Sequence, residues 1–180
     1  MNAKIKLHDL VFEKMISAAE IDAAVSRVAE QINADYCSTE QPPIIFSVLN
    51  GAFMFTSDLC KKFEFCPEIT FVKLSSYDGT ESSGAVKSLI GLNKSVEGRD
   101  VIIVEDIVDS GNTIVYIDQY LKGLNPASVR YCSLFLKPNS YDKDVKIDYV
   151  AMEIGNEFIV GYGLDYNELG RNLQDIYVTK

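Results

Sequence analysis

The chain has 180 residues, 47% of them hydrophobic and 24% charged, which is ordinary for one globular domain with a sizeable core. Its formal net charge of −9 disfavours binding to nucleic acid, so we expect no nucleic-acid partner. No apolar run is long enough to span a membrane, and residues 1–9 contain no signal-peptide region, so we expect no membrane association.

The apolar residues of the chain alternate between the periods of strands and helices. Residues 11–12 predict a short strand or extended arm, and Ser17 with Glu20 has the capping-box spacing that begins a helix over 18–34. Strands are expected over 44–49, 68–75, 86–92, 101–104, 128–136, 148–153 and 176–179, with a further apolar run at 158–160. Helices are expected over 52–63 and from 114 to near Gly123, where the later Pro126 also indicates an end.

This order of elements indicates the fold class. Strands that alternate with helices predict an α/β domain, a mostly parallel twisted sheet flanked by helices. Ligands of such sheets bind beyond the carboxyl ends of the strands. The sequence contains no internal repeat and no interdomain linker, so residues 1–180 are expected to form a single domain.

Residues 101–113 combine a strand, an acidic pair, a compact loop and the start of a helix. The four β-branched apolar residues 101–104 are typical of a strand buried on both faces, and Glu105 and Asp106 follow at once. The loop that comes next consists of Asp109, Ser110, Gly111, Asn112 and Thr113. A small loop that opens a helix offers free backbone N–H groups and the positive end of the helix dipole, so it predicts a phosphate-binding site.

The acidic pair beside this loop needs a different ligand, because carboxylates repel phosphate. Carboxylates accept hydrogen bonds from sugar hydroxyls and ligate Mg²⁺. A phosphorylated ribose that carries a Mg²⁺-complexed pyrophosphate has all three features. The structural alternative is a buried strand with a solvated acidic end and a capped helix. The Walker A pattern of phosphate loops does not occur in the sequence.

Histidine and cysteine are too scarce to carry much of the chemistry. His8 is the single histidine and lies near the N-terminus, so carboxylates must serve in any acid–base step. The cysteines Cys37, Cys60, Cys66 and Cys132 show no C-x-x-C spacing. We expect them to be reduced thiols of a cytoplasmic protein, and we expect no structural zinc site.

Other residues admit both a functional and a structural interpretation. Asn50 and Gly51 lie between a strand and a helix, where they form either a second anion site or a plain turn. Lys137 at a strand end and Arg171 are by type solvated surface cations, and Phe158 is by type a core residue. Residues 75–84 form a polar loop, long for its position, that is either a mobile lid or an ordinary connection.

Residues 101–113 resemble the phosphoribosyl-pyrophosphate motif of the type I phosphoribosyltransferases. The Glu-Asp-Ile-Val-Asp-Ser-Gly form is similar to the hypoxanthine and hypoxanthine-guanine branch. The resemblance extends over residues 44–178 and includes residues 48–55 and 158–168 as separate matching segments. It implies transfer of a 5-phosphoribosyl group from phosphoribosyl pyrophosphate to hypoxanthine, and to guanine, in purine salvage, with Mg²⁺ as the cofactor.

The resemblance also implies a role for each matching residue. Asp109 is the implied general base at the purine N7, and the bond between Leu49 and Asn50 is implied to be a cis peptide. Phosphoribosyl pyrophosphate is implied to bind Glu105, Asp106, Asp109, Ser110, Gly111, Asn112, Thr113, Asn50, Gly51, Ser76, Tyr77 and Arg171. The purine is implied to bind Lys137, Phe158, Ile159 and Asp165, and the metal Glu105, Asp106 and Asp165. A small hood over the site is implied for the N-terminal arm and roughly residues 137–180.

The sequence departs from the family pattern after Lys137. The family often carries a basic residue a few positions later, where this chain has residues 138–141, Pro-Asn-Ser-Tyr. Two rival functions remain at this point. One is a related enzyme that prefers xanthine or guanine, and the other is a non-catalytic regulator with the same fold. The family also implies a homodimer or a homotetramer.

Overall fold

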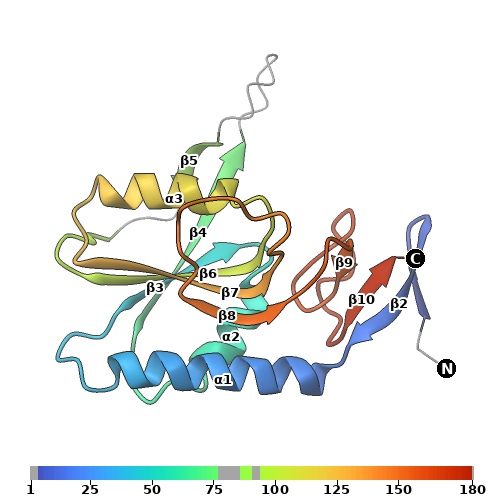
Figure 1. Cartoon of the computed structure of the whole chain (residues 1–180), viewed down its shortest axis with the longest axis horizontal. Helices are drawn as coiled ribbons and strands as arrows, with labels where there is room; N and C mark the ends of the chain where they lie inside the picture. Colours follow the sequence, from blue (N-terminus) through green and yellow to red (C-terminus); the bar gives the residue numbers. More distant parts are fainter. Residues whose placement is uncertain (1–3, 77–85, 91–93, 180) are drawn as a thin grey trace.

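The chain folds into two sheets and three helices, as the computed structural model of residues 4–76, 86–90 and 94–179 describes (Figure 1). The helices are α1 (Ala18–Tyr36), α2 (Phe53–Cys60) and α3 (Asn112–Lys122). The larger sheet contains β3 (Ile44–Leu49), β4 (Glu68–Ser76), β5 (Val86–Ile90), β6 (Asp100–Val108), β7 (Ser128–Leu136) and β8 (Tyr149–Glu153). The smaller sheet contains β1 (Lys4–Leu7), β2 (Leu10–Ile16), β9 (Ile159–Val160) and β10 (Ile176–Thr179).

The larger sheet has the order β5-β4-β3-β6-β7-β8, and all its neighbours pair in parallel except β4 with β5. Its centre is formed by β3 and β6, paired from Ile44 opposite Val101 onward. Both strands are continuous runs of buried apolar residues over most of their length, as strands covered on both faces require. The α/β class expected from the sequence is therefore confirmed.

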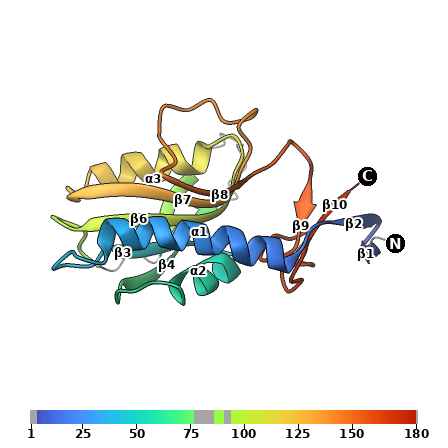
Figure 2. The same ribbon diagram turned by 60° about the horizontal axis from the view of Figure 1, so that its bottom comes forward.

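Helices cover both faces of this sheet. Figures 1 and 2 show α1 and α2 on one face and α3 on the other. The alternation of side chains along β6 divides the core accordingly, because Ile102 and Val104 pack in the layer of α1 and α2, whereas Val101 and Ile103 pack in the layer of α3. Each such buried side chain stabilises the fold by about 1.5–3 kcal/mol.

The longest helix, α1, begins where the sequence predicts it. The Ser17 hydroxyl accepts from the Glu20 backbone N–H, and the Glu20 carboxylate accepts from the Ser17 backbone N–H at 2.8 Å, so the capping box is present. The helix continues to Tyr36, two residues beyond the expected end, because Asn33 and Tyr36 are buried against neighbouring segments. α1 connects the small sheet to the large one.

The small sheet is the hood implied by the resemblance, with the order β1-β2-β10-β9 (Figure 1). It joins the two ends of the chain, since β2 pairs with β10. Two details differ from the sequence expectation. β8 belongs to the large sheet, so the part of 137–180 in the hood begins only after Glu153, and the expected N-terminal strand is a hairpin of β1 and β2. Hydrophobic periodicity in such short strands indicates neither the sheet to which β8 belongs nor the pairing of β1 with β2.

Within the described part of the chain, no helix combines the length and the apolar character needed to cross a membrane. The four cysteines are free thiols.

Candidate active site

The acidic pair lies inside β6 and not after it. β6 extends through both carboxylates to Val108, because the strand stays paired with β7, with Glu105 opposite Ser133. Successive residues of a strand point to opposite faces. Glu105 accordingly lines the cavity at the start of α3, whereas the Asp106 carboxylate lies against Gly51. The sequence predicted one acidic pair, and the two carboxylates still act on one another, because Asp106 is both a neighbouring charge and a hydrogen-bond partner of Glu105.

Burial disfavours the charged form of both carboxylates. Glu105 is 5% exposed, and its burial, together with the neighbouring Asp106, raises its pKa well above the usual range. Burial also raises the pKa of Asp106 to about 6, against the opposing effect of the hydrogen bond from the Ile107 N–H. Arg171 lowers the pKa of Asp106 and Asp165 raises it, so these charges belong to one electrostatic environment. Such an environment favours the binding of a cation or a hydroxyl donor.

The loop of residues 109–113 opens α3. Gly111 is the N-cap residue and has a φ of +75°, a left-handed conformation that glycine adopts without strain. Because glycine has no side chain, the first N–H groups of α3 receive no side-chain cap and remain available to a ligand. A cavity of about 110 Å³ is lined by these loop residues together with Glu105, Ile107, Val108 and Ile114. The loop is hereafter called the phosphate loop.

Lys137 and Asp109 form an ion pair beside the phosphate loop. The Lys137 ammonium Nζ lies 2.8 Å from Asp109 Oδ2, and its backbone N–H donates to the Val108 carbonyl at 2.9 Å. Lys137 is 7% exposed, whereas the Asp109 side chain is 52% exposed. Lys137 is therefore not the solvated strand-end charge that its residue type suggests. Lys137, the predicted purine-binding residue, and Asp109, the predicted general base, are thus in direct contact.

A second ion pair holds Arg171. Its Nη2 lies 2.7 Å from Asp165 Oδ1, and its Nη1 donates to the Gly163 carbonyl at 2.9 Å. The other Asp165 oxygen accepts from the Glu168 N–H at 2.7 Å. Arg171 is thus fixed by Asp165 and the Gly163 carbonyl, and it is not a free surface cation.

Two glycines bring the hood loop and the large sheet into contact. A Cβ atom on Gly163 would lie 2.0 Å from the Gly51 carbonyl oxygen, and one on Gly51 would lie 1.5 Å from Asp106 Oδ2. Neither position has room for a side chain. The contact places residues 50–51, the end of β6 and the Arg171 segment next to one another. The peptide bond between Leu49 and Asn50 is cis, as the resemblance implied.

Phe158 and Ile159 lie at the edge of the hood. Phe158 is 47% exposed and contacts Phe12 and Tyr166 edge-on or tilted, with ring centroids 6.3 and 5.8 Å away. Its ring is therefore supported by other rings yet still accessible, unlike the core residue that its apolar context suggests. Ile159 is buried in β9, where it pairs with Val178.

Some of the expected arrangement is not assembled. Among the described residues, no three acidic, histidine or cysteine side chains are gathered as a metal site, so Glu105, Asp106 and Asp165 do not form a ready-made one. The physical reason is that Asp165 is engaged by Arg171, while the Asp106 carboxylate lies against Gly51. Of the expected lid, Ser76 ends β4, and Tyr77 lies outside the described residues.

The structure also adds residues that the sequence did not indicate. The Tyr141 ring and the Lys143 side chain lie against Gly111, and the Tyr162 hydroxyl donates to Asp58 of α2 at 2.7 Å. Gly163 is a third case. The one available signal for it was the Gly-Tyr-Gly spacing in the hood loop, and none existed for Tyr141 or Lys143.

The fold and these side chains define a phosphoribosyltransferase. A family model described as the phosphoribosyl transferase domain matches residues 16–167. Because that match covers most of the chain, the chain belongs to this family.

Curated relatives indicate the branch of the family. The hypoxanthine-guanine phosphoribosyltransferase of Mycobacterium bovis is 41% identical over 90% of this chain and 83% of that protein. The hypoxanthine phosphoribosyltransferase of Salmonella typhimurium is 38% identical over 93% of this chain and 94% of that protein.

Solved structures of the same branch have the same fold. A hypoxanthine phosphoribosyltransferase from Staphylococcus aureus is 37% identical and superimposes with a TM-score of 0.82, over 93% of this chain and 91% of that one. One from Trypanosoma cruzi is 34% identical, with a TM-score of 0.85 over 98% and 95% of the two chains.

Proposed function

We propose that the chain transfers the 5-phosphoribosyl group of phosphoribosyl pyrophosphate to hypoxanthine, and also to guanine, in purine salvage. The observation that carries the proposal is the buried Lys137 paired with Asp109 at the mouth of the phosphate loop. A lysine ammonium can donate to the exocyclic oxygen of a 6-oxopurine, while an adjacent carboxylate accepts the proton of a ring nitrogen. The products are inosine or guanosine 5′-monophosphate and pyrophosphate.

In the proposed reaction the purine N9 forms a bond to the anomeric carbon, and the bond from that carbon to the pyrophosphate oxygen breaks. Asp109 accepts the proton at the purine N7 as general base. Positive charge develops on the ribose ring in the transition state, and the carboxylates of β6 stabilise it. Lys137 orients the base, and Phe158 stacks on it with its accessible face while the Ile159 backbone contacts its edge.

The other substrate binds along the sheet edge in this proposal. The backbone N–H groups of the phosphate loop hold the 5-phosphate, and the Ser110 and Thr113 hydroxyls add donors. Residues 50–51 and Arg171 hold the pyrophosphate, while Glu105 and Asp106 accept from the ribose hydroxyls. Residues Ser76 and Tyr77 belong to the proposed lid that keeps water from the activated sugar.

Mg²⁺ fits these residues as an ion that enters with the substrate. The ion commonly takes one or two carboxylates together with phosphate oxygens, and Asp106 and Asp165 share one electrostatic environment beside the proposed pyrophosphate position. Asp106, Asp165 and, from the ribose side, Glu105 would hold it. When bound, Mg²⁺ neutralises the charge that builds on the pyrophosphate leaving group.

Parallel assays of hypoxanthine, guanine, xanthine and adenine test this proposal. Each base is incubated with phosphoribosyl pyrophosphate and Mg²⁺, and pyrophosphate release and the nucleotide product are measured. We expect turnover with hypoxanthine and guanine, and its loss in excess chelator. Xanthine as the preferred base, or undiminished turnover in chelator, contradicts the proposal.

We further propose that the chain acts in the cytoplasm as a homodimer or homotetramer. The free cysteines support a reducing compartment. An exposed apolar surface supports assembly, because Phe53, Ile69 and Phe71 are each more than 40% exposed and border one cavity of about 390 Å³. Sedimentation of the wild type and of Phe71→Glu tests this assembly, with dissociation expected for the variant.

A further inference from the structure

The phosphate loop lacks a positive charge of its own. Its residues are Asp109, Ser110, Gly111, Asn112 and Thr113, so its one charged side chain is negative. Glu105 lines the same cavity. Backbone N–H groups supply only partial positive charge to a phosphate dianion. A ligand phosphate here therefore calls for a cation from another segment.

Two cations beside the site are already held by carboxylates of the site. Lys137 pairs with Asp109, and Arg171 pairs with Asp165. In the function proposed above, these two cations are directed at the purine and at the pyrophosphate. Neither is free to neutralise the 5-phosphate.

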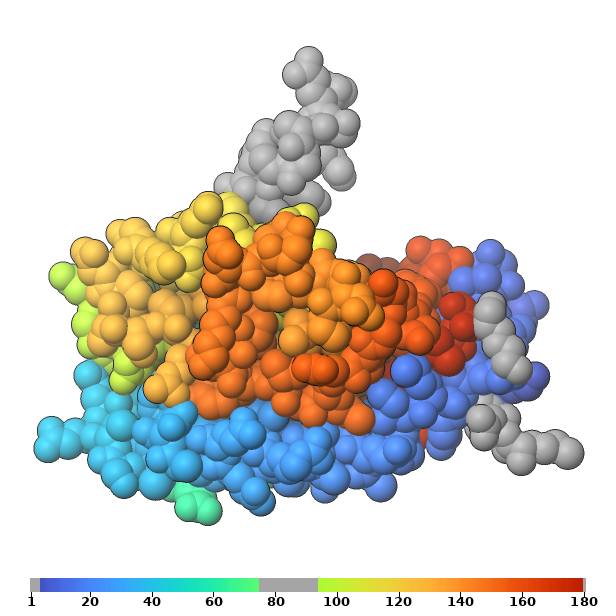
Figure 3. Space-filling model, viewed as in Figure 1, coloured from blue at the N-terminus to red at the C-terminus, as the bar shows by residue number. Residues whose placement is uncertain are grey.

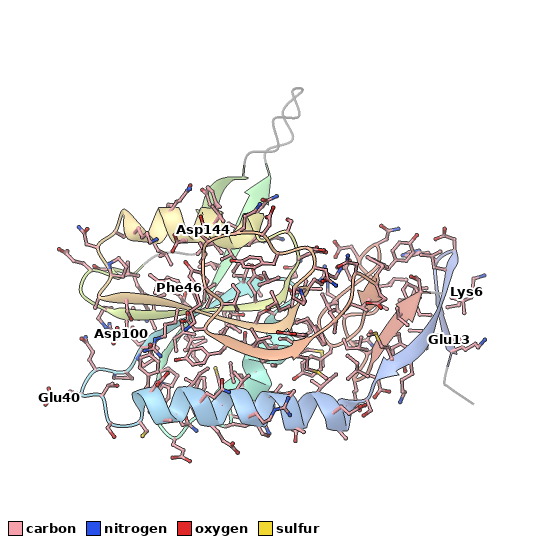
Figure 4. The ribbon with its side chains drawn as sticks, in the orientation of Figure 1. Lys6, Glu13, Glu40, Phe46, Asp100 and Asp144 are labelled. Carbon is pink, nitrogen blue, oxygen red and sulfur yellow. The ribbon has the colours of Figure 1, made fainter. Side chains whose placement is uncertain are left out.

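The side-chain stem of a third basic residue, Lys143, lies directly against the phosphate loop. A Cβ atom on Gly111 would lie 2.3 Å from Tyr141 Cε2 and 3.1 Å from Lys143 Cγ. Both residues belong to the segment between β7 and β8, which runs beside α3 in Figure 1, and Asp144 of this segment is labelled there in Figure 4. The space-filling view shows the same segment, in orange, lying against the yellow surface of α3 (Figure 3).

Lys143 is held only weakly by its present partner. Its ammonium lies 2.6 Å from Asp142 Oδ1, but Asp142 is its sequence neighbour and that side chain is 77% exposed. Exposed ion pairs of this kind contribute little to stability. The methylene groups beyond Cγ let the ammonium move without displacing the stem that packs on Gly111. Tyr141 fixes the backbone of this segment, because its hydroxyl donates to the Val145 carbonyl.

We propose that Lys143 binds the 5-phosphate of the substrate and of the nucleotide product, and that the Tyr141 ring positions it against Gly111. This inference rests on the function proposed above. It gives the chain a cation outside residues 138–141, where the resemblance expects a basic residue and the sequence has none. Lys143 is a phosphate-binding residue here, and Tyr141 is a positioning residue.

The test compares ligands that differ only in the phosphate. Binding of inosine 5′-monophosphate and of inosine is measured by calorimetry or by competition for Lys143→Gln, Lys143→Arg and the matched control Lys146→Gln. Lys146 lies in the same segment with a side chain that is 81% exposed. The variant loses a charge-assisted hydrogen bond to the phosphate, so we expect Lys143→Gln to weaken nucleotide binding roughly tenfold or more.

The expected pattern has further parts. Inosine binding and the KM for hypoxanthine stay unchanged in Lys143→Gln, whereas the KM for phosphoribosyl pyrophosphate rises by about the same factor. Lys143→Arg restores nucleotide binding, and Lys146→Gln resembles the wild type. For Tyr141, the Ala variant weakens nucleotide binding in the same selective way, and its folded state is checked by thermal unfolding.

Failure of this inference is distinct from failure of the proposed function. If the wild type forms inosine 5′-monophosphate but Lys143→Gln binds it as tightly as the wild type, the inference is wrong. It is equally wrong if inosine and the nucleotide weaken together, because the residue then acts on the shape of the site. If the wild type forms no nucleotide from any 6-oxopurine, the proposed function itself fails.

Discussion

The two sides of the site are built in different ways. On the sheet side, Glu105, Asp106 and the phosphate loop come from nine consecutive residues at the end of one buried strand and the start of one helix. On the other side, Lys137, Phe158 and Arg171 come from separate connecting segments. The first side carries negative charge and helix N–H groups, whereas the second carries cations and an aromatic ring.

The difference shows how the site is kept stable without its ligands. Cations from the connecting segments are paired with carboxylates, as in Lys137 with Asp109 and Arg171 with Asp165. A partly buried charge without a partner is costly, so these pairs lower the cost of holding both signs of charge in one place. In the proposed function, substrates exchange these partners. Substitutions that separate pairing from chemistry therefore examine the two sides independently.

The largest expected effect is that of Asp109→Asn. The amide keeps the shape and can still accept from Lys137, but it has no basicity. Turnover should fall by about 10²–10⁴, the usual contribution of a general base, while binding of phosphoribosyl pyrophosphate changes little. Single-turnover rates and substrate affinity measure the two separately. Near-wild-type turnover in a folded variant would remove Asp109 from the base role.

Lys137→Gln is the matching change on the other side of that pair. We expect the KM for hypoxanthine to rise about 10–100-fold, because a charged hydrogen bond to the purine oxygen is lost. The KM for phosphoribosyl pyrophosphate should change much less. A double-mutant cycle with Asp109→Asn measures the coupling of the pair in urea unfolding, and full additivity there would mean that the ion pair contributes nothing to stability.

Phe158→Leu examines the aromatic part of the same side. Stacking on a base contributes about 1–3 kcal/mol, so affinity for hypoxanthine and guanine should fall roughly tenfold. Phe158→Tyr serves as the control and should retain the wild-type affinity. If both variants bind purines normally, the ring serves only to cover Phe12 and Tyr166.

The smallest expected effect is that of Asp106→Asn on the stability of the ligand-free protein, which we expect the substitution to increase. Burial raises the pKa of Asp106 from 3.8 to about 6, so the folded state binds a proton that the unfolded chain has already released between these values. Its contribution to stability is therefore present below pH 3.8 and is lost as the pH rises through about 6. We expect Asp106→Asn to raise the free energy of unfolding at pH 7.5 by about 1–2 kcal/mol.

The same variant should bind Mg²⁺ with substrate more weakly than the wild type. Urea unfolding at pH 5 and pH 7.5 measures the stability gain, and the exposed Asp144→Asn is the control, with no change expected. A loss of stability at pH 7.5 would mean that the Asp106 carboxylate is stabilised by its neighbours in spite of its burial.

The sequence predicted the two sides of the site to different extents. Residues 101–113 are contiguous, and the carboxyl end of a buried strand next to a small loop has a physical meaning that periodicity reveals. The cations could not be placed in this way, because Lys137 and Arg171 depend on contacts with residues 28 and 6 positions away. Residue type alone predicted that both are surface charges, and only the family resemblance implied a role for each in the site.

The strand boundaries show the same limit on a smaller scale. Glu105 and Asp106 suggested the end of β6, since charged residues are uncommon in buried strands, yet pairing with β7 carries the strand to Val108. The hood hairpin of β1 and β2 was missed because its strands are short and half exposed. In contrast, the capping box of α1 is local, and its residues alone specified the helix start.

The contact between Gly163 and Gly51 bears on how this enzyme family is surveyed by mutation. Mutational scans that shorten side chains detect residues whose side chains are needed. They cannot detect Gly51 and Gly163, which have no side chain to remove. Here the harm comes from addition, because even one methyl group at Gly163 would meet the Gly51 carbonyl at 2.0 Å. Gly163→Ala would wedge the hood loop away from the end of β3 and increase the distance from Arg171 to the carboxylates of β6. The close approach of the hood loop to the large sheet therefore depends on the absence of a side chain at Gly51 and at Gly163.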